Sequence, residues 1–174
     1  MFFLYGYGGT GKNFMWITLS SALQSEGKIV LTVSSSGIAS LLLHGGRKTH
    51  SKFKILVPTL EHFVCNITKG SELSDLMKLA NLIIWDEAPM AHKYCFEACD
   101  RTLKDIMREK NKSNSVFDGK VVVFEEDFRQ ILHVTPRGSR SDIVHAIINS
   151  SYLWDHCQIM NLTKNMRLLR NGLQ

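Results

Sequence analysis

The sequence contains few of the residues that mark several classes of protein. Only 3 of its 174 residues are proline and 12 are glycine, which excludes collagen-like and low-complexity chains. Its 4 cysteines are too few to predict a disulfide framework, so we expect a reducing compartment. No run approaches the roughly 20 apolar residues of a membrane span, and the apolar start lacks the basic residues of a signal peptide. We therefore expect no membrane partner.

What remains is the composition of an ordinary globular domain. Apolar residues make up 44% of the chain and charged residues 21%, and the length allows one domain over residues 1–174 with a substantial core. Lys and Arg number 21 against 16 Asp and Glu, which gives a net charge of +5. A positive charge of this size permits a nucleic-acid partner without requiring one.

Short apolar runs alternate with helical stretches along the chain. The predicted strands are residues 2–5, 29–33, 82–85, 121–124 and 159–162, and the predicted helices are 12–26, 34–43, 96–107 and 142–148. In the first helix, Met15, Leu19, Ala22 and Leu23 are predicted to form the buried face. This alternation predicts an α/β fold in which helices cover a mostly parallel sheet.

The segment between the first strand and the first helix has the spacing of a nucleotide phosphate loop: a glycine, four residues, then Gly-Lys. The predicted nucleotide-binding residues are Gly6, Gly8, Gly9, Thr10, Gly11, Lys12 and Asn13. Glycines let the backbone N–H groups point at the β-phosphate, and Lys12 would bridge the β- and γ-phosphates. Because the segment follows a strand and opens a helix, phosphate binding is favoured over a plain glycine turn.

The residue after this lysine departs from the usual pattern. Ser or Thr normally stands there and its hydroxyl holds Mg²⁺, whereas this chain has Asn13. Its amide oxygen lies one bond further from the backbone, and Mg²⁺ tolerates little displacement from octahedral geometry. We therefore expect weakened Mg²⁺ binding and slow hydrolysis, with nucleotide binding less affected.

Two carboxylates follow the predicted strand 82–85. Asp86 would hold Mg²⁺ through its water shell, and Glu87 would orient or deprotonate the attacking water. The alternative is a strand that ends in solvated acids, but the phosphate loop in the same chain favours the functional interpretation. Gln130, past the strand 121–124, is a candidate sensor of the γ-phosphate, although the residues alone favour a polar loop there.

These motifs occur in an order that resembles the Pif (petite integration frequency) DNA helicases, relatives of RecD in helicase superfamily one. The matching segments are Gly6–Lys12, Ser36–Ser40, Gly45–Arg47, Thr49–Ser51, Trp85–Met90, Asp127–Gln130 and Leu162–Arg167. The resemblance implies a three-layer RecA-like P-loop NTPase domain, the first motor domain of an ATP-dependent DNA helicase. It further implies ATP as substrate, Mg²⁺, single-stranded DNA as partner and 5′-to-3′ unwinding. It places the chain in DNA repair, recombination and telomere maintenance, in the nucleus or mitochondrion.

The family's roles carry over where residues match. The resemblance implies that Glu87, Gln130 and Arg167 are catalytic, with Arg167 as the arginine that stabilises the transferring phosphate; the alternative for Arg167 is a solvated surface charge. It implies that a further group contacts single-stranded DNA, for which the alternative is a solvated basic loop. This group comprises Ser36, Gly37, Arg47, Thr49, His50 and Ser51.

The departures from the family predict reduced activity. Asn13 stands where the family has Thr, and Glu125 and Glu126 stand where it usually has Gly-Gly. Like charges about 4 Å apart at an effective dielectric of about 20 repel by about 4 kcal/mol, so an acid beside the γ-phosphate would oppose ATP. We also expect the chain to be truncated relative to the family, without the second motor domain that unwinding needs. The alternative function is a degenerate, non-catalytic nucleotide- or DNA-binding remnant; a small P-loop kinase does not explain residues 127–130.

Overall fold

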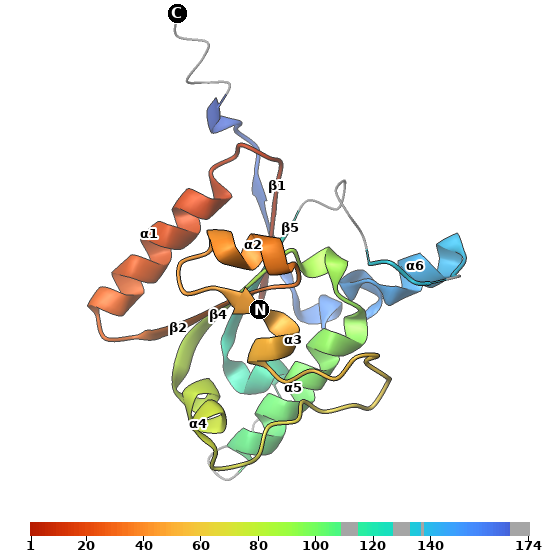
Figure 1. The fold of residues 1–174 in the computed structure, drawn as a ribbon. Coiled ribbons are helices and arrows are strands. Elements are labelled where there is room, and N and C mark those ends of the chain that lie inside the picture. Colours follow the sequence, from red (N-terminus) through yellow and green to blue (C-terminus); the bar gives the residue numbers. More distant parts are fainter. Residues whose placement is uncertain (109–114, 127–132, 137, 168–174) are drawn as a thin grey trace, which may run out of the picture.

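The computed structural model describes residues 1–108, 115–126, 133–136 and 138–167. These residues form a six-stranded sheet in the order β3-β2-β4-β5-β1-β6, and every described pairing between neighbouring strands is parallel (Figure 1). The strands are β1 (Phe2–Gly6), β2 (Ile29–Ser34), β3 (Arg47–Lys48), β4 (Ala80–Asp86), β5 (Val121–Glu126) and β6 (Gln158–Leu162). The predicted α/β fold with a parallel sheet is confirmed.

Helices connect these strands along the chain. The α-helices are α1 (Lys12–Ser25), α2 (Gly37–Leu42), α3 (Thr49–Lys52), α4 (Glu72–Leu79), α5 (Lys93–Met107) and α6 (Arg140–Ala146). Short 3-10 helices cover Ala88–Met90, Val116–Gly119, Ile148–Ser150 and Trp154–His156. None of the described helices combines the length and the apolar character needed to cross a lipid bilayer.

Side chains that alternate along the central strands divide the core into two halves. On one face of the sheet, Leu4, Ile84 and Val123 pack with Trp16 of α1. On the other face, the neighbouring strand residues pack with a larger cluster that includes α5; this cluster contains Phe3, Ile83, Val122, Phe96 and Leu103. The sheet therefore lies between α1 and α5, which Figure 1 shows on its two sides, as in the predicted three-layer architecture.

The predicted buried face of α1 is correct in part, because Met15 and Leu23 are half-buried and pack against the core cluster on the face of the sheet that α1 covers. The fully buried residues of the helix are Trp16 and Ser20, whereas Leu19 and Ala22 are exposed. Apolar residues lie all around this helix, and Phe14 remains 75% exposed. The sequence pattern therefore identified only part of the face that packs on the sheet.

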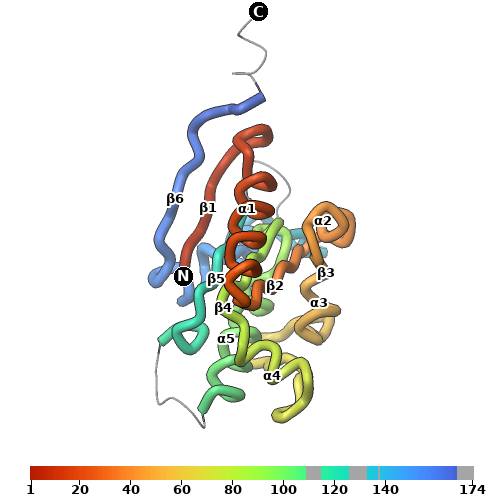
Figure 2. Tube along the Cα trace, turned by 90° about the vertical axis from the view of Figure 1, so that its left-hand side faces the viewer, coloured from red at the N-terminus to blue at the C-terminus, as the bar shows by residue number. Residues whose placement is uncertain are grey.

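The parallel strands bring distant parts of the chain to one edge of the sheet. β1 ends at Gly6, β4 at Asp86 and β5 at Glu126, and Figures 1 and 2 show β1 and β6 running to the same end of the molecule. In parallel α/β sheets, ligands bind at the carboxyl ends of the strands. The candidate site is therefore expected at this edge.

Candidate functional site

The loop between β1 and α1 turns sharply through left-handed glycines. Gly9 and Gly11 have φ values of 88° and 87°, which a residue with a side chain adopts only at a cost. Thr10 closes the turn, because its backbone N–H and its hydroxyl both donate to the Tyr7 carbonyl, at 3.3 and 2.8 Å. Gly11 is the N-cap of α1 and offers no capping side chain, so the first N–H groups of the helix are left for a ligand.

Lys12 folds back over this loop. Its Nζ donates to the Gly6 carbonyl at 2.6 Å and lies 3.6 Å from Oε1 of Glu125 on β5. The ammonium is therefore held between the loop backbone and a carboxylate, at the position where the motif predicts contact with phosphate. The lysine is placed for the predicted role but already has an anionic partner.

Glu125 is the buried anion of this site. Its side chain is 1% exposed, and its Oε2 accepts a hydrogen bond from Trp16 Nε1 on α1. Burial raises the pKa of the Glu125 carboxyl to about 7, and the charge of Asp86 adds to the rise, while Trp16 and Lys12 oppose it. The side chain of Glu126 lies outside the described part of the structure.

Asp86 and Glu87 lie at the end of β4, beside β5. Burial, followed by the charge of Glu87, raises the pKa of Asp86 to about 6, although the Glu87 backbone N–H donates to Asp86 Oδ1 at 2.9 Å. Glu87 has a φ of 55°, a left-handed conformation that is uncommon for a residue other than glycine. Such backbone strain persists where the surrounding structure enforces it and is frequent at functional sites.

The donor atoms at this edge suit Mg²⁺. Asp86 supplies a carboxylate whose raised pKa reflects its burial and the neighbouring charge of Glu87. Within the described ranges no group of three or more His, Cys, Asp or Glu is arranged to hold a metal ion. Mg²⁺ sites in proteins often use one or two carboxylates together with the substrate's phosphates. Asn13, the other predicted ligand, is exposed in the first turn of α1.

The segment after β6 covers the phosphate loop. The Met166 N–H donates to the Gly9 carbonyl at 2.9 Å, and Asn165 Nδ2 donates to the Gly8 carbonyl at 3.3 Å. A Cβ atom on Gly9 would lie 3.2 Å from Cδ of Arg167, so a side chain there would crowd this contact. The structure thus brings the predicted Arg167 to the loop, whereas the predicted Gln130 lies outside the described residues.

The predicted DNA-contact residues lie at the start of α2 and in β3 and α3. Ser36 caps α2 by accepting a hydrogen bond from the Ala39 N–H at 3.4 Å, and the exposed members of the group are Gly37, Arg47 and Ser51. Thr49 is fully buried. Among the described residues, neither the Thr49 hydroxyl nor the half-buried His50 Nδ1 has a hydrogen-bond partner.

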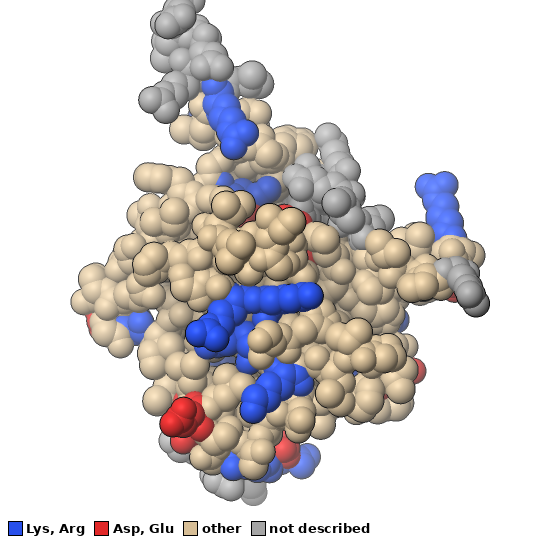
Figure 3. Space-filling view, in the orientation of Figure 1, with Lys and Arg blue, Asp and Glu red and all other residues tan. Residues whose placement is uncertain are grey.

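Positive charge surrounds these residues. Figure 3 shows Lys and Arg side chains gathered near the middle of the face that carries α2 and α3. The basic residues in this part of the chain are Arg47, Lys48, Lys52 and Lys54. Burial and then the charge of Lys48 and His133 lower the pKa of His50, so its imidazole is more readily neutral than an exposed histidine. A surface of this charge suits contact with nucleic-acid phosphates.

Two tryptophans connect the site to its surroundings, a role that the sequence did not reveal. Trp16 donates to Glu125, and Trp85 Nε1 donates to Ser35 Oγ at 2.9 Å. The Trp85 ring also lies 5.9 Å from the ring of Phe53, between centroids. Trp85 directly precedes Asp86, so the end of β4 contacts Ser35, just before the predicted DNA-contact residues, and Phe53, just after them.

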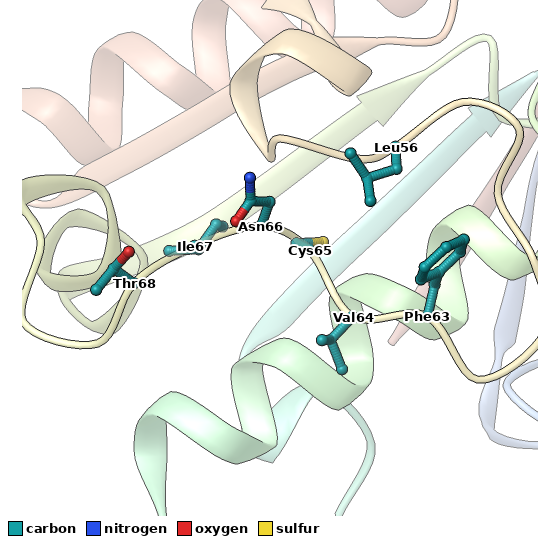
Figure 4. A pocket seen from close by; sticks show the side chains of 7 residues that line it. All are labelled: Leu56, Phe63, Val64, Cys65, Asn66, Ile67 and Thr68. Atoms are coloured by element: carbon teal, nitrogen blue, oxygen red, sulfur yellow. The ribbon is translucent and has the colours of Figure 1, made fainter.

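A separate hollow lies on the segment before α4. It has a volume of about 300 Å³ and is lined by Leu56, Phe63, Val64, Cys65, Asn66, Ile67 and Thr68 (Figure 4). None of these lining residues is charged, and none belongs to the phosphate loop. This hollow does not have the chemistry of a phosphate site.

Comparison with known proteins agrees with this geometry. The chain is 27% identical to the ATP-dependent DNA helicase Pif1 of Campylobacter jejuni over 168 residues, which cover 92% of this chain and 35% of the relative. It is 26% identical to the ATP-dependent DNA helicase PIF4 of Trypanosoma brucei brucei over 144 residues, which cover 80% of this chain and 17% of the relative. The chain thus spans about a third or less of these curated relatives.

Solved structures show the same similarity. Bacteroides Pif1 bound to single-stranded DNA has a TM-score of 0.76 and 25% identity, over 95% of this chain and 39% of that one. Bacteroides Pif1 in complex with ADP-AlF4 has a TM-score of 0.75 and 25% identity, over 95% of this chain and 38% of that one. The family model described as PIF1-like helicase matches residues 1–174. The chain therefore belongs to the PIF1-like helicase family.

Proposed function

We propose that this chain is the nucleotide-binding motor domain of an ATP-dependent DNA helicase. One observation carries the proposal: the phosphate loop, the Asp86–Glu87 pair and Arg167 come from distant parts of the sequence and meet at one edge of a parallel sheet. The Bacteroides relative that was solved with ADP-AlF4 supports nucleotide use by this fold. Unwinding itself would require a second motor domain.

In this proposal each residue has a distinct task. The loop N–H groups and Lys12 bind the β- and γ-phosphates, and Asp86 holds Mg²⁺, which would neutralise charge that develops on the phosphates. Glu87 positions the attacking water, and Arg167, whose side chain lies where a Cβ on Gly9 would meet it, stabilises the transferring phosphate.

The basic surface around α3 would bind single-stranded DNA. Support comes from its exposed positive charge and from the Bacteroides relative that was solved bound to single-stranded DNA. The proposal extends to 5′-to-3′ translocation in DNA repair, recombination and telomere maintenance, in the nucleus or mitochondrion. These finer assignments rest on the family resemblance.

A second candidate function is nucleotide or DNA binding without turnover. The observation that favours it is the ion pair between Lys12 and the buried Glu125. The ammonium that would bind the γ-phosphate of ATP already has a carboxylate partner. Asn13, which replaces the usual hydroxyl ligand of Mg²⁺, acts in the same direction.

An ATPase assay with and without single-stranded DNA separates the two functions. We expect slow hydrolysis by the natural chain and faster, DNA-stimulated hydrolysis by the triple variant Asn13→Thr, Glu125→Gly, Glu126→Gly, because it restores a hydroxyl ligand and removes two acids. Adding Lys12→Ala to the triple variant is the control and should abolish the gain. A triple variant that folds but hydrolyses no more ATP than the natural chain would support the non-catalytic function.

A further inference from the structure

We propose that Glu125 makes this phosphate loop select a nucleoside diphosphate over the corresponding triphosphate. The inference rests on the proposed function, since it concerns the same nucleotide site. It assigns to Glu125 a role in specificity, because its carboxylate pairs with Lys12, the residue that would otherwise bind the γ-phosphate.

The contacts of Glu125 fix it in this position. Oε1 lies 3.6 Å from Lys12 Nζ, and Oε2 accepts a hydrogen bond from Trp16 Nε1, so each carboxylate oxygen is engaged by a different residue of α1. The side chain is 1% exposed, and its neighbour across the sheet is Leu4 of β1. A buried carboxylate with two partners does not swing into solvent to make room for a ligand.

The β- and γ-phosphates depend on Lys12 to different degrees. The β-phosphate is bound mainly by backbone N–H groups and the start of α1, which the Glu125 carboxylate leaves available. The γ-phosphate needs the lysine ammonium and brings additional negative charge. That ammonium is already paired with Glu125, and repulsion between like charges is strong where water is excluded. The penalty therefore falls on the triphosphate.

A calorimetric titration measures this selectivity. ADP and a non-hydrolysable β,γ-imido triphosphate are titrated into the natural chain, with Mg²⁺ and again with a chelator. The titrations are run at about pH 8, above the raised pKa of Glu125, so that its carboxyl is mostly ionised. We expect ADP to bind about tenfold more tightly than the triphosphate in both conditions, a difference of about 1.4 kcal/mol.

The test variant is Glu125→Gln, which keeps the size of the side chain and removes its charge. Its preference for ADP should disappear, mainly because the triphosphate binds more tightly. Glu26→Gln is the matched control, since Glu26 is exposed at the end of α1 and pairs only with Lys28 among the described ion pairs. Thermal melts confirm folding, and Glu125→Ala replaces the Gln variant if that variant does not fold.

The outcomes separate this inference from the proposed function. The selectivity is overturned if the natural chain binds the triphosphate as tightly as ADP, for instance because Mg²⁺ bridges the carboxylate and the γ-phosphate. So does a preference for ADP that persists in Glu125→Gln. If neither nucleotide binds to the natural chain or to the Glu125 variants, the proposed nucleotide site itself is wrong.

Discussion

At the scale of single residues, three charges set the electrostatics of the site. Lys12 is the one cation that the motif requires, and it faces Glu125 and, through a weaker interaction, Asp86. Both carboxyl groups have raised pKa values, about 7 for Glu125 and about 6 for Asp86, with burial as the largest cause. One lysine does not fully offset the charges of the buried Glu125 and the half-buried Asp86.

This excess of buried acid predicts a pH dependence of stability. The carboxyl of Glu125 stays protonated up to about pH 7 in the folded chain, whereas in the unfolded chain it loses its proton near the usual pKa of 4.5. The contribution of this group to the free energy of unfolding is therefore complete below pH 4.5 and is lost as the pH rises through 7. In Glu125→Gln that loss should be absent. Chemical denaturation across this pH range measures the free energy of unfolding of the natural chain and of the variant. Histidines such as His50 contribute in the opposite direction, but equally in both proteins, so the difference between the two proteins isolates Glu125.

Two results would bear on this pH prediction. Glu26→Gln, an exposed control, should keep the pH dependence of the natural chain. Parallel pH profiles for the natural chain and Glu125→Gln would show that the Glu125 pKa is not raised in the folded state.

The sequence predicted the residues of the site better than their contacts. Lys12 and Asp86 were predicted because motif spacing and strand ends are local features of the chain. The hydrogen bond between Trp16 and Glu125 joins residues 109 positions apart, and no local pattern indicates it. Trp16 therefore appeared in the sequence only as a core or interface residue.

At the scale of elements, helices next to long apolar strands were predicted and those within residues 47–79 were not. β3 has two residues and α3 four, which is too short for a periodic pattern. α4 did carry a signal: Ser71 caps it by accepting a hydrogen bond from the Ser74 N–H, and Glu72 and Asp75 stand in its first turn. A search for N-caps would have found this helix.

Asp100 joins α5 to two other segments of the chain and should be critical for stability. It is fully buried and accepts hydrogen bonds from the Phe117 N–H and the Tyr152 hydroxyl, both at 2.5 Å, and from Lys104 Nζ at 2.8 Å. Asp100→Ala leaves these donors without their acceptor, so we expect the free energy of unfolding to fall by about 3–5 kcal/mol in denaturant titrations.

A second aspartate on α5 is the control for that variant. Asp105 is exposed and pairs with Lys69 at 3.0 Å, so Asp105→Ala should cost about 1 kcal/mol or less. Equal losses in the two variants would mean that Asp100 does not hold α5 to its neighbours.

At the scale of the whole molecule, the parallel topology explains why a site could be predicted at all. Every described strand runs in the same direction, so residues 6–12, 86–87 and 125 reach one edge although they are far apart in sequence. The strand pattern was sufficient to predict that edge. The position of residues 165–167 over the loop also required β6 to pair beside β1, an order that the sequence pattern did not specify.

The most direct test of the account is whether ADP binds to the loop through Lys12. Calorimetry on the natural chain and on Lys12→Ala, with Lys28→Ala as an exposed control, should show saturable ADP binding that Lys12→Ala weakens by about 10- to 100-fold. The loss has two causes: the variant removes the contact of the ammonium with the β-phosphate, and it leaves the Glu125 carboxylate without its cation beside the nucleotide. Lys28→Ala should bind ADP like the natural chain. Equal affinity of the natural chain and Lys12→Ala, or no binding by the natural chain at saturating ADP, would contradict the account.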